Sequence, residues 1–428
     1  MQKKIVIIGG GISGISAAIY ALKNNFDVTL IEASNNLGGR LYSKYDSETH
    51  DSYDNGQHIM VGAYNVFLEL LRELGSLDKL YVQDKFKVNY ITKDNKFELK
   101  SVFFDNQIGF LFGLLSLKVF NFSEKINIIR LVLDIKLNKF FKNNDRFIDT
   151  LKKYKQTENV IKILWEPLCV STLNTSIYES STSVIANVLK QSFFADGFNS
   201  KLIIPKVGLS ELLSNFEDYF IKKGGKILKN HSLKDMIISI DKIEKIILTK
   251  DKELTADFYI SALSNERYNK YFPSKLELET SSIISAYLWY DIDFIKEEMI
   301  SVVGYNIQWI FNKRKFGFNG GILEYKGYYS IVISDADTLL DKSNSEIEKL
   351  IVDEINEIFP VEKQLLKIKV IKEKMATIKA DTKSIELKRN FKNKIKNLAI
   401  AGDWLDIELP STIETAAKSG KNAIQSIL

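Results

Sequence analysis

The feature that most restricts the fold is a glycine-rich turn near the N-terminus. Gly9, Gly11 and Gly14 form the pattern G-x-G-x-x-G and directly follow an apolar stretch at residues 5–8. In a strand, turn and helix of this kind, the glycines permit the turn, the approach of a phosphate and close packing of the helix. The amides and the dipole at the helix N-terminus attract the phosphates. We therefore expect Gly9, Gly11, Ser13 and Gly14 to bind a dinucleotide.

An acid ends the next expected strand. Glu32 follows the β-branched and aliphatic residues 28–31 and lies 18 residues after Gly14. A carboxylate at this place accepts hydrogen bonds from both hydroxyls of an adenosine ribose. A 2′-phosphate would be repelled there, so the pattern disfavours NADP and leaves FAD or NAD as the ligand.

A second glycine cluster follows soon after. Gly38, Gly39 and Arg40 offer a flexible backbone and a guanidinium that can meet a phosphate or the edge of a flavin. These residues favour FAD over NAD.

The C-terminal part adds a further candidate. Gly402 and Asp403 follow an expected strand at residues 398–401, and a helix of small residues is expected from Thr412 to residue 427. An acid and a helix N-terminus there could serve the ribityl chain and a flavin carbonyl, so we expect Gly402, Asp403 and Thr412 to bind FAD. The alternative is that Asp403 is only a turn or capping acid.

The 428 residues exceed the size at which one core usually stops growing, roughly 250–300 residues, so two domains are expected. The sequence predicts an α/β fold in which a Rossmann-like, glutathione-reductase-like FAD-binding domain joins a second domain of mixed sheet and helices. We assign residues 1–80, 200–265 and 395–428 to the FAD-binding domain, and residues 81–199 and 266–394 to a substrate domain. Residues 81–200 are expected to form helices, and residues 226–260 a meander that returns to the first domain.

Composition excludes several function classes. The net charge of +5 combines 59 basic with 54 acidic residues, and this interleaved balance does not indicate nucleic-acid binding. A single cysteine, Cys169, excludes an intrachain disulfide, and with three histidines we expect no metal site. The apolar stretch at the N-terminus is too short for the core of a signal peptide, so we expect a cytoplasmic protein.

One segment is a candidate for contact with a membrane. Residues 108–117 form the longest apolar run and precede Lys118, but about 20 residues are needed to span a bilayer. We expect at most a peripheral contact on the inner membrane face.

Further stretches resemble the flavoprotein superfamily of phytoene desaturases and amine oxidases. Within it, the chain resembles the hydroxysqualene dehydroxylases, also called squalene-associated FAD-dependent desaturases. These stretches are scattered along nearly the whole chain. They are DNGQH at residues 54–58, GAY at 62–64, WEPLC at 165–169, LNT at 173–175, LIIPKV at 202–207, AGDW at 401–404 and LPSTIE at 409–414.

The resemblance implies a step of hopanoid or related squalene biosynthesis, in which hydroxysqualene loses its hydroxyl and gains a hydride from reduced FAD. The substrate would be a long-chain isoprenoid, for which the 26 Phe and 19 Tyr residues can line a dry tunnel, although most of them are expected to be core. His58 is the leading candidate proton donor, with Asp54 and Glu166 behind it. A turn in which His58 only binds backbone is an equally good interpretation. The reductant of the flavin is left open.

Three other functions remain as alternatives. The first is a carotenoid desaturase of the phytoene type, which has the same flavin and the opposite direction of electron flow. The second is a flavin amine oxidase. The third is a non-catalytic prenyl-lipid carrier that resembles this fold, although the glycine motif, Glu32, Arg40 and Asp403 argue against it.

Overall fold

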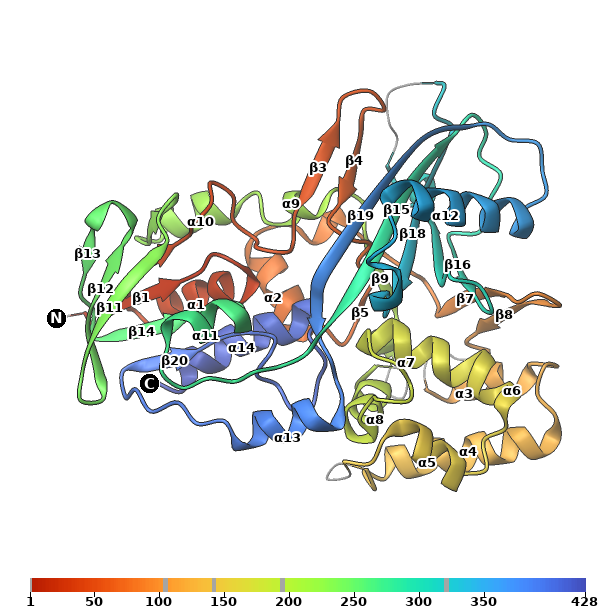
Figure 1. The fold of residues 1–428 in the computed structure, drawn as a ribbon, viewed down its shortest axis with the longest axis horizontal. Coiled ribbons are helices and arrows are strands. Elements are labelled where there is room, and N and C mark those ends of the chain that lie inside the picture. Colours follow the sequence, from red (N-terminus) through yellow and green to blue (C-terminus); the bar gives the residue numbers. More distant parts are fainter. Residues whose placement is uncertain (1, 103–106, 141–143, 193–196, 319–322) are drawn as a thin grey trace.

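The structure is a computed structural model, and it describes residues 2–102, 107–140, 144–192, 197–318 and 323–428 (Figure 1). Two sheets dominate it. A five-stranded sheet lies with α1 and α14 in the left part of Figure 1, and a seven-stranded sheet lies in the upper right part with α12. Helices α3 to α8 lie below the larger sheet. This arrangement confirms the expected α/β fold class.

The five-stranded sheet is parallel and has the order β10-β2-β1-β14-β20. Successive side chains of a strand point to opposite faces, and both faces of this sheet are covered. Ile5 and Ile7 of β1 therefore pack in one apolar cluster, whereas Val6 and Ile8 pack in another. The strands are β1 (Lys4–Ile8), β2 (Asp27–Ile31), β10 (Lys226–Leu228), β14 (Phe258–Ser261) and β20 (Leu398–Ile400).

Different elements cover the two faces. On one face, α1 (Ile12–Lys23) packs against α14 (Ile413–Gln425), and the hydroxyl of Ser16 donates to the carbonyl of Ala417 at 2.6 Å. On the other, the antiparallel strands β11 (Leu233–Ser239), β12 (Lys242–Leu248) and β13 (Glu253–Leu254) contribute to the second cluster. The expected meander at residues 226–260 is thus wrong in its first strand, because β10 pairs with β2 and not with β11.

The seven-stranded sheet is mixed and has the order β19-β15-β18-β17-β16-β7-β8. Alternation along β15 again separates two cores: Tyr287 and Trp289 face the helical part, whereas Leu288 and Tyr290 face α12 (Asn344–Ile358). The strands are β7 (Lys87–Ile91), β8 (Lys96–Lys100), β15 (Thr280–Tyr290), β16 (Met299–Val302), β17 (Trp309–Asn312), β18 (Gly327–Ser334) and β19 (Leu365–Ile378).

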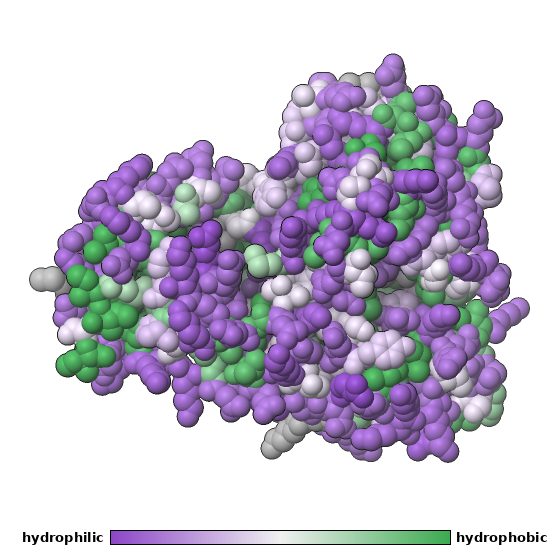
Figure 2. Space-filling model, viewed as in Figure 1, coloured by the Kyte–Doolittle hydropathy of each residue, from purple (hydrophilic) through white to green (hydrophobic). Residues whose placement is uncertain are grey.

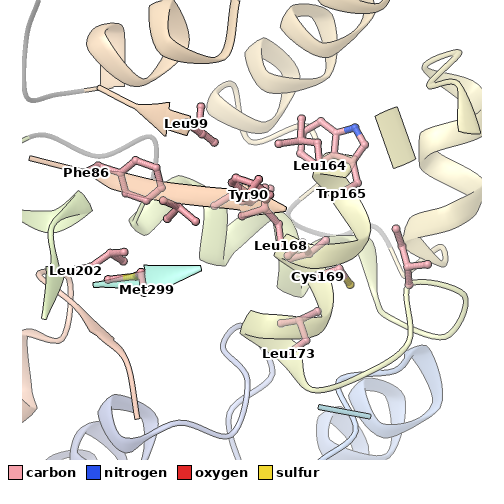
Figure 3. Packing of buried hydrophobic residues seen from close by; sticks show 14 of the residues in the cluster. Phe86, Tyr90, Leu99, Leu164, Trp165, Leu168, Cys169, Leu173, Leu202 and Met299 are labelled. Atoms are coloured by element: carbon pink, nitrogen blue, oxygen red, sulfur yellow. The ribbon is translucent and has the colours of Figure 1, made fainter. Parts of the chain in front are cut away.

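The helical part shares one large apolar cluster with the inner face of this sheet. Figure 3 shows Trp165, Leu168 and Cys169 near Tyr90 and, across the cluster, Met299. The helices are α3 (Gln107–Ser116), α4 (Phe122–Lys136), α5 (Phe147–Lys153), α6 (Glu158–Val160), α7 (Glu166–Leu173) and α8 (Thr182–Gln191), and a π-helix (Ile161–Trp165) joins α6 to α7. The expectation of helices throughout residues 81–200 is wrong at its start, where β7 and β8 form the edge of the sheet. β7 and β8 form a local antiparallel hairpin, but the pairing that joins it to the sheet is between β7 and β16, more than 200 residues away, and the sequence around β7 gives no signal of it.

Short elements connect these layers. The strands are β3 (Ser43–Asp46), β4 (Asp51–Asp54), β5 (Met60–Val61), β6 (Leu80–Val82) and β9 (Leu202–Pro205). The helices are α2 (Asn65–Glu73), α9 (Leu209–Leu212), α10 (Phe216–Lys222), α11 (Asn265–Tyr271) and α13 (Thr382–Asn390). The proposed domain boundaries stay a prediction.

Polar side chains cover most of the face seen in Figure 2, and smaller apolar patches interrupt them. Within the described residues, no helix combines the length and apolar character needed to cross a bilayer. The segment expected to touch a membrane forms most of α3. Its Phe110 and Leu114 are buried, whereas Ile108 and Phe112 remain about half exposed.

Candidate active site

The glycine turn brings the N-terminus of α1 very close to β1. Gly9 has φ +112°, which favours glycine, and a Cβ atom at Gly14 would lie 1.9 Å from the carbonyl oxygen of Gly9. Gly11 is the N-cap residue of α1, and among the described residues no side chain caps this end. The amides of the first turn are therefore available to an anion.

The second glycine segment lies directly against the first. The amide of Gly38 donates to the carbonyl of Gly10 at 2.8 Å, and Gly11 and Gly38 form a β-bridge. Gly39 has φ +62°, and a Cβ there would lie 3.1 Å from the Cα of Gly11. Two glycine segments thus meet at the N-terminus of α1. Residues with side chains at these positions would occupy the space between the two segments.

Glu32 and Ser13 lie on either side of this corner. The carboxylate of Glu32 accepts from the amides of Gly10 and Ser34, each at 2.8 Å. A carboxylate has about four lone-pair sites, so it can accept further donors such as ribose hydroxyls. The hydroxyl of Ser13 is buried and receives the hydroxyl of Ser419 at 3.4 Å. Its side chain therefore faces α14, and its amide is the part that an anion would meet.

Arg40 joins the two ends of the chain. Its guanidinium donates to Asp403 at 2.6 Å and to the carbonyl of Ala376 at 2.7 Å. The charge of Asp403 raises the pKa of Arg40. Gly402 also needs its small size, because a Cβ there would lie 2.3 Å from the indole nitrogen of the buried Trp404.

Thr412 is the N-cap of α14. Its hydroxyl accepts from the amide of Thr415 at 3.2 Å. The same helix start holds a neighbouring element, because Glu414 accepts from the amides of Val66 and Phe67 at the start of α2. Within the stretch at residues 409–414, Thr412 and Glu414 at the start of α14 thus have defined hydrogen-bond partners.

These residues fit FAD. An uncapped helix end, two backbone segments in contact and an acid at the end of β2 are the groups that would hold the phosphates and ribose of a dinucleotide. The Arg40–Asp403 pair adjoins these groups, because Arg40 directly follows Gly39. Gly9, Gly11, Gly14, Glu32 and the Gly38–Gly39 backbone would hold the adenosine and pyrophosphate parts, and Asp403 with Arg40 the part nearer the flavin.

His58 lies beside these polar groups. Its Nδ1 is 2.8 Å from the carbonyl oxygen of Gly56, which can only accept, so Nδ1 carries a hydrogen. Burial lowers the pKa of His58, which also feels the charges of Asp54, Arg40 and Lys313. The neutral ring therefore has its free lone pair on Nε2, and it must take up a proton before it can give one.

Asp54 belongs to a buried ion pair that the sequence did not indicate. Its carboxylate lies 3.5 Å from the ammonium of Lys313 and also accepts from Ser43 and from the amide of Leu209. Lys313 is fully buried, donates to Gln57 at 3.1 Å and lies 3.8 Å from the centre of the Phe318 ring. Burial lowers the pKa of Lys313, against the opposing effect of Asp54. The pair fixes the segment at residues 54–58.

A second ion pair adjoins the first in sequence. Arg314 binds both oxygens of Asp51, at 2.6 and 2.9 Å, and Trp289 donates to the same carboxylate at 2.9 Å. Such a bidentate contact gives geometric specificity as well as energy. Together the two pairs attach β4 to the larger sheet.

Two further acids deserve comparison with His58. Glu373 of β19 accepts from the side chain of Asn55 at 3.0 Å, and the sequence analysis missed it because no local motif connects two residues 318 positions apart. Glu166, the first residue of α7, is half buried, and burial raises its pKa. A raised pKa keeps a carboxyl group protonated to higher pH, as a donor requires.

The LNT stretch positions the helical part. Asn174 ends α7 in the left-handed conformation, and its side chain donates to the hydroxyl of Thr377 at 2.9 Å and accepts from the amide of Asp335 at 2.7 Å. The hydroxyl of Thr175 accepts from the amide of Ala380 at 3.0 Å. This stretch therefore fastens α7 to the sheet.

Residues 12–428 match the family described as flavin containing amine oxidoreductase. The chain belongs to this family. It is an FAD-dependent oxidoreductase, which confirms the expected cofactor and enzyme class.

Relatives and solved structures add detail to this assignment. The chain is 25% identical to a hydroxysqualene dehydroxylase from Sinorhizobium fredii, across 99% of this chain and 98% of the relative. It is 21% identical to a 15-cis-phytoene desaturase from Synechococcus elongatus, across 99% and 96%. The structure of an oxidoreductase from Methanosarcina mazei superposes with a TM-score of 0.75, 17% identity and 99% coverage of both chains. This last likeness confirms the fold.

The packing at Gly14 predicts the effect of a single methyl group. We expect Gly14→Ala to weaken flavin binding strongly and to cost about 1–3 kcal/mol of stability, because α1 must move off β1. The measurement is the absorbance of bound flavin relative to protein, followed by thermal unfolding. Gly75→Ala is the control: it strains a residue with φ +64° where the added Cβ meets nothing within 4 Å. Full flavin content in Gly14→Ala would contradict this packing.

The Asp54–Lys313 pair predicts a non-additive double-mutant cycle. Lys313→Met leaves a carboxylate buried without its cation, which costs about 3–5 kcal/mol. Adding Asp54→Asn removes the stranded charge, so the double variant should recover part of this loss in denaturant unfolding. Additive effects of the two substitutions would show that the groups do not interact.

Proposed function

We propose that the protein catalyses the reductive dehydroxylation of hydroxysqualene to squalene. The observation that carries this proposal is the similarity to hydroxysqualene dehydroxylase along nearly the full length of both chains. Two further relatives of the same name, 24% identical, support it. A shared fold alone would not, because related folds host many reactions.

The surroundings of residues 54–58 support an apolar substrate. Ile59, Ile283, Trp309 and Ile371 are partly exposed and pack against the large apolar cluster of the helical part. Two of them lie near the segment: Ile59 directly follows it in sequence, and Ile283 pairs across the sheet with Glu373, the partner of Asn55. We propose that these four side chains line the space in which the isoprenoid lies, and that they keep water away from it.

In the proposed reaction, the carbon–oxygen bond of the alcohol breaks, the oxygen leaves as water with an added proton, and a hydride takes its place. When bound, reduced FAD supplies this hydride. The chain must supply or relay the proton and must hold the reacting carbon in position.

In this proposal either His58 or Glu166 supplies the proton. His58 lies beside Arg40 and Asp54, but its lowered pKa limits its protonated form to acidic conditions. Glu166 has a raised pKa and lies at the start of α7, next to Trp165 of the apolar cluster. Asp54 accepts hydrogen bonds and an ion pair, so we propose that it positions the segment instead of donating.

A phytoene-type desaturase is the second candidate. A desaturase also matches nearly the whole chain, and it would remove hydride from its substrate instead of adding one. Amine oxidation has less support, because the relatives above are named for isoprenoid substrates. A non-catalytic prenyl carrier is not supported, because the chain is an FAD-dependent oxidoreductase.

An anaerobic assay separates these reactions. Purified enzyme with chemically reduced flavin is given hydroxysqualene, and enzyme with oxidised flavin is given phytoene. We expect squalene from the first mixture. New conjugated absorbance from the second, without squalene from the first, would assign the protein to the desaturases, and no product from either would reject both reactions.

If His58 is the donor, turnover depends on its protonated form. We then expect wild-type turnover to fall as the pH rises through a midpoint below the ordinary histidine value of 6.5, because only the cationic ring can donate. His58→Ala should lower turnover about a hundredfold and leave flavin content unchanged. The exposed His50→Ala is the control. Loss of flavin from His58→Ala would instead give His58 a structural or cofactor-binding role.

A further inference from the structure

Helix α4 exposes an apolar stripe on the side opposite its buried face. Phe122, Ile126, Leu133 and Leu137, the residue after the helix, are 80%, 42%, 49% and 68% exposed. At 3.6 residues per turn, these positions and the half-buried Ile129 fall within about 80° of the helix circumference. The buried side carries the apolar residues Ile128, Leu131, Val132 and Ile135, together with the capping acid Glu124. The helix is therefore apolar on two opposite faces, and only one of them serves the core.

Basic side chains flank the stripe. Lys125 and Lys136 lie on one side of it and Arg130 on the other, at positions set by the helical repeat. The two acids of α4 are already engaged. Asp134 pairs with Lys139 and accepts from Tyr154, and Glu124 forms the capping box at the helix start. The outer face of α4 thus combines apolar side chains with a local excess of positive charge.

We propose that this outer face of α4 docks the protein on a lipid bilayer that contains anionic lipid. An apolar stripe with cationic flanks matches the acyl and headgroup regions of such a surface when a helix lies in its plane. The choice of lipid as the partner rests on the proposed function, because an apolar isoprenoid resides in a bilayer. A helix of 15 residues is about 22 Å long, which suits contact along the surface.

The proposed contact differs from the one expected from hydropathy along the sequence. Residues 108–117 have the longest apolar run, but α3 uses Phe110 and Leu114 in the core. The stripe of α4 is interrupted by polar residues in the sequence and becomes continuous only on the folded helix.

Vesicle flotation of the flavin-loaded protein tests the proposal. The vesicles contain phosphatidylcholine alone or phosphatidylcholine with phosphatidylglycerol, and they contain no substrate. The stripe variant is Ile126→Ser with Leu133→Ser. The matched control is Ile221→Ser with Ile237→Ser, which changes two residues of similar exposure, 54% and 40%, on α10 and β11. A charge variant, Lys125→Gln with Lys136→Gln, tests the cationic flanks.

We expect wild type and control to float with the anionic vesicles. The stripe variant should bind these vesicles at least about tenfold more weakly, because two aliphatic side chains are no longer buried in the bilayer on binding. The charge variant should lose about fivefold per lysine at low salt. All variants should retain flavin, and their turnover with detergent-dispersed hydroxysqualene should match wild type.

Three results would overturn the proposal. They are wild-type protein that does not float, a stripe variant that floats as well as the control, and a wild-type dimer that the stripe variant abolishes in sedimentation. The last would assign the face to a second copy of the chain. Flotation that depends on the stripe, without squalene formation, would reject the proposed reaction but keep the docking face. Squalene formation together with flotation that does not depend on the stripe would reject the docking face but keep the proposed reaction.

Discussion

The structure depends on the close approach of α1 to β1. With a carbonyl oxygen where the Cβ of residue 14 would be, helix and strand touch through bare backbone. The same lack of side chains lets Gly38 and Gly39 lie against Gly10 and Gly11. The other side of α1 is equally close to α14, where a Cβ at Gly420 would lie 2.2 Å from the carbonyl oxygen of Ser13. The candidate FAD site is thus formed largely by backbone packing around the glycines. The paired side chains of Arg40 and Asp403 lie at its far end.

That far end is held by charges from distant parts of the chain. Arg40 and Asp403 are 363 residues apart in sequence, and Asp54 and Lys313 are 259 apart. Buried ion pairs are costly to desolvate and do not by themselves imply a gain in stability. Their value here is geometric, because they hold residues 54–58 between the candidate FAD site and the larger sheet. This explains how His58 comes to lie near Arg40 although no local pattern connects them.

The helical part combines an inner and an outer apolar surface. Its inner surface joins the face of the seven-stranded sheet that carries Tyr287 and Trp289, and Asn174 fastens α7 to β15 and β19. Its outer surface leaves the stripe of α4 in solvent. A substrate that is insoluble in water would need both: an apolar space beside the flavin and a way to meet the phase that contains it.

The glycine turn, the acid that ends β2 and the α/β class were predictable from the sequence, because each shows in residues close together in the chain. The choice of FAD also used Gly402 and Asp403, which repeat a local pattern of strand, glycine and acid near the other end of the chain. Spacing and periodicity report such local geometry directly. Only the tertiary structure decided that β7 and β8 extend the large sheet, that Lys313 and Glu373 adjoin residues 54–58, and that α4 exposes an apolar face. These features depend on contacts between segments up to hundreds of residues apart, or on which of two apolar helix faces finds a partner. The local sequence does not identify the distant segment that a strand or helix face contacts, because that contact forms only when the whole chain folds.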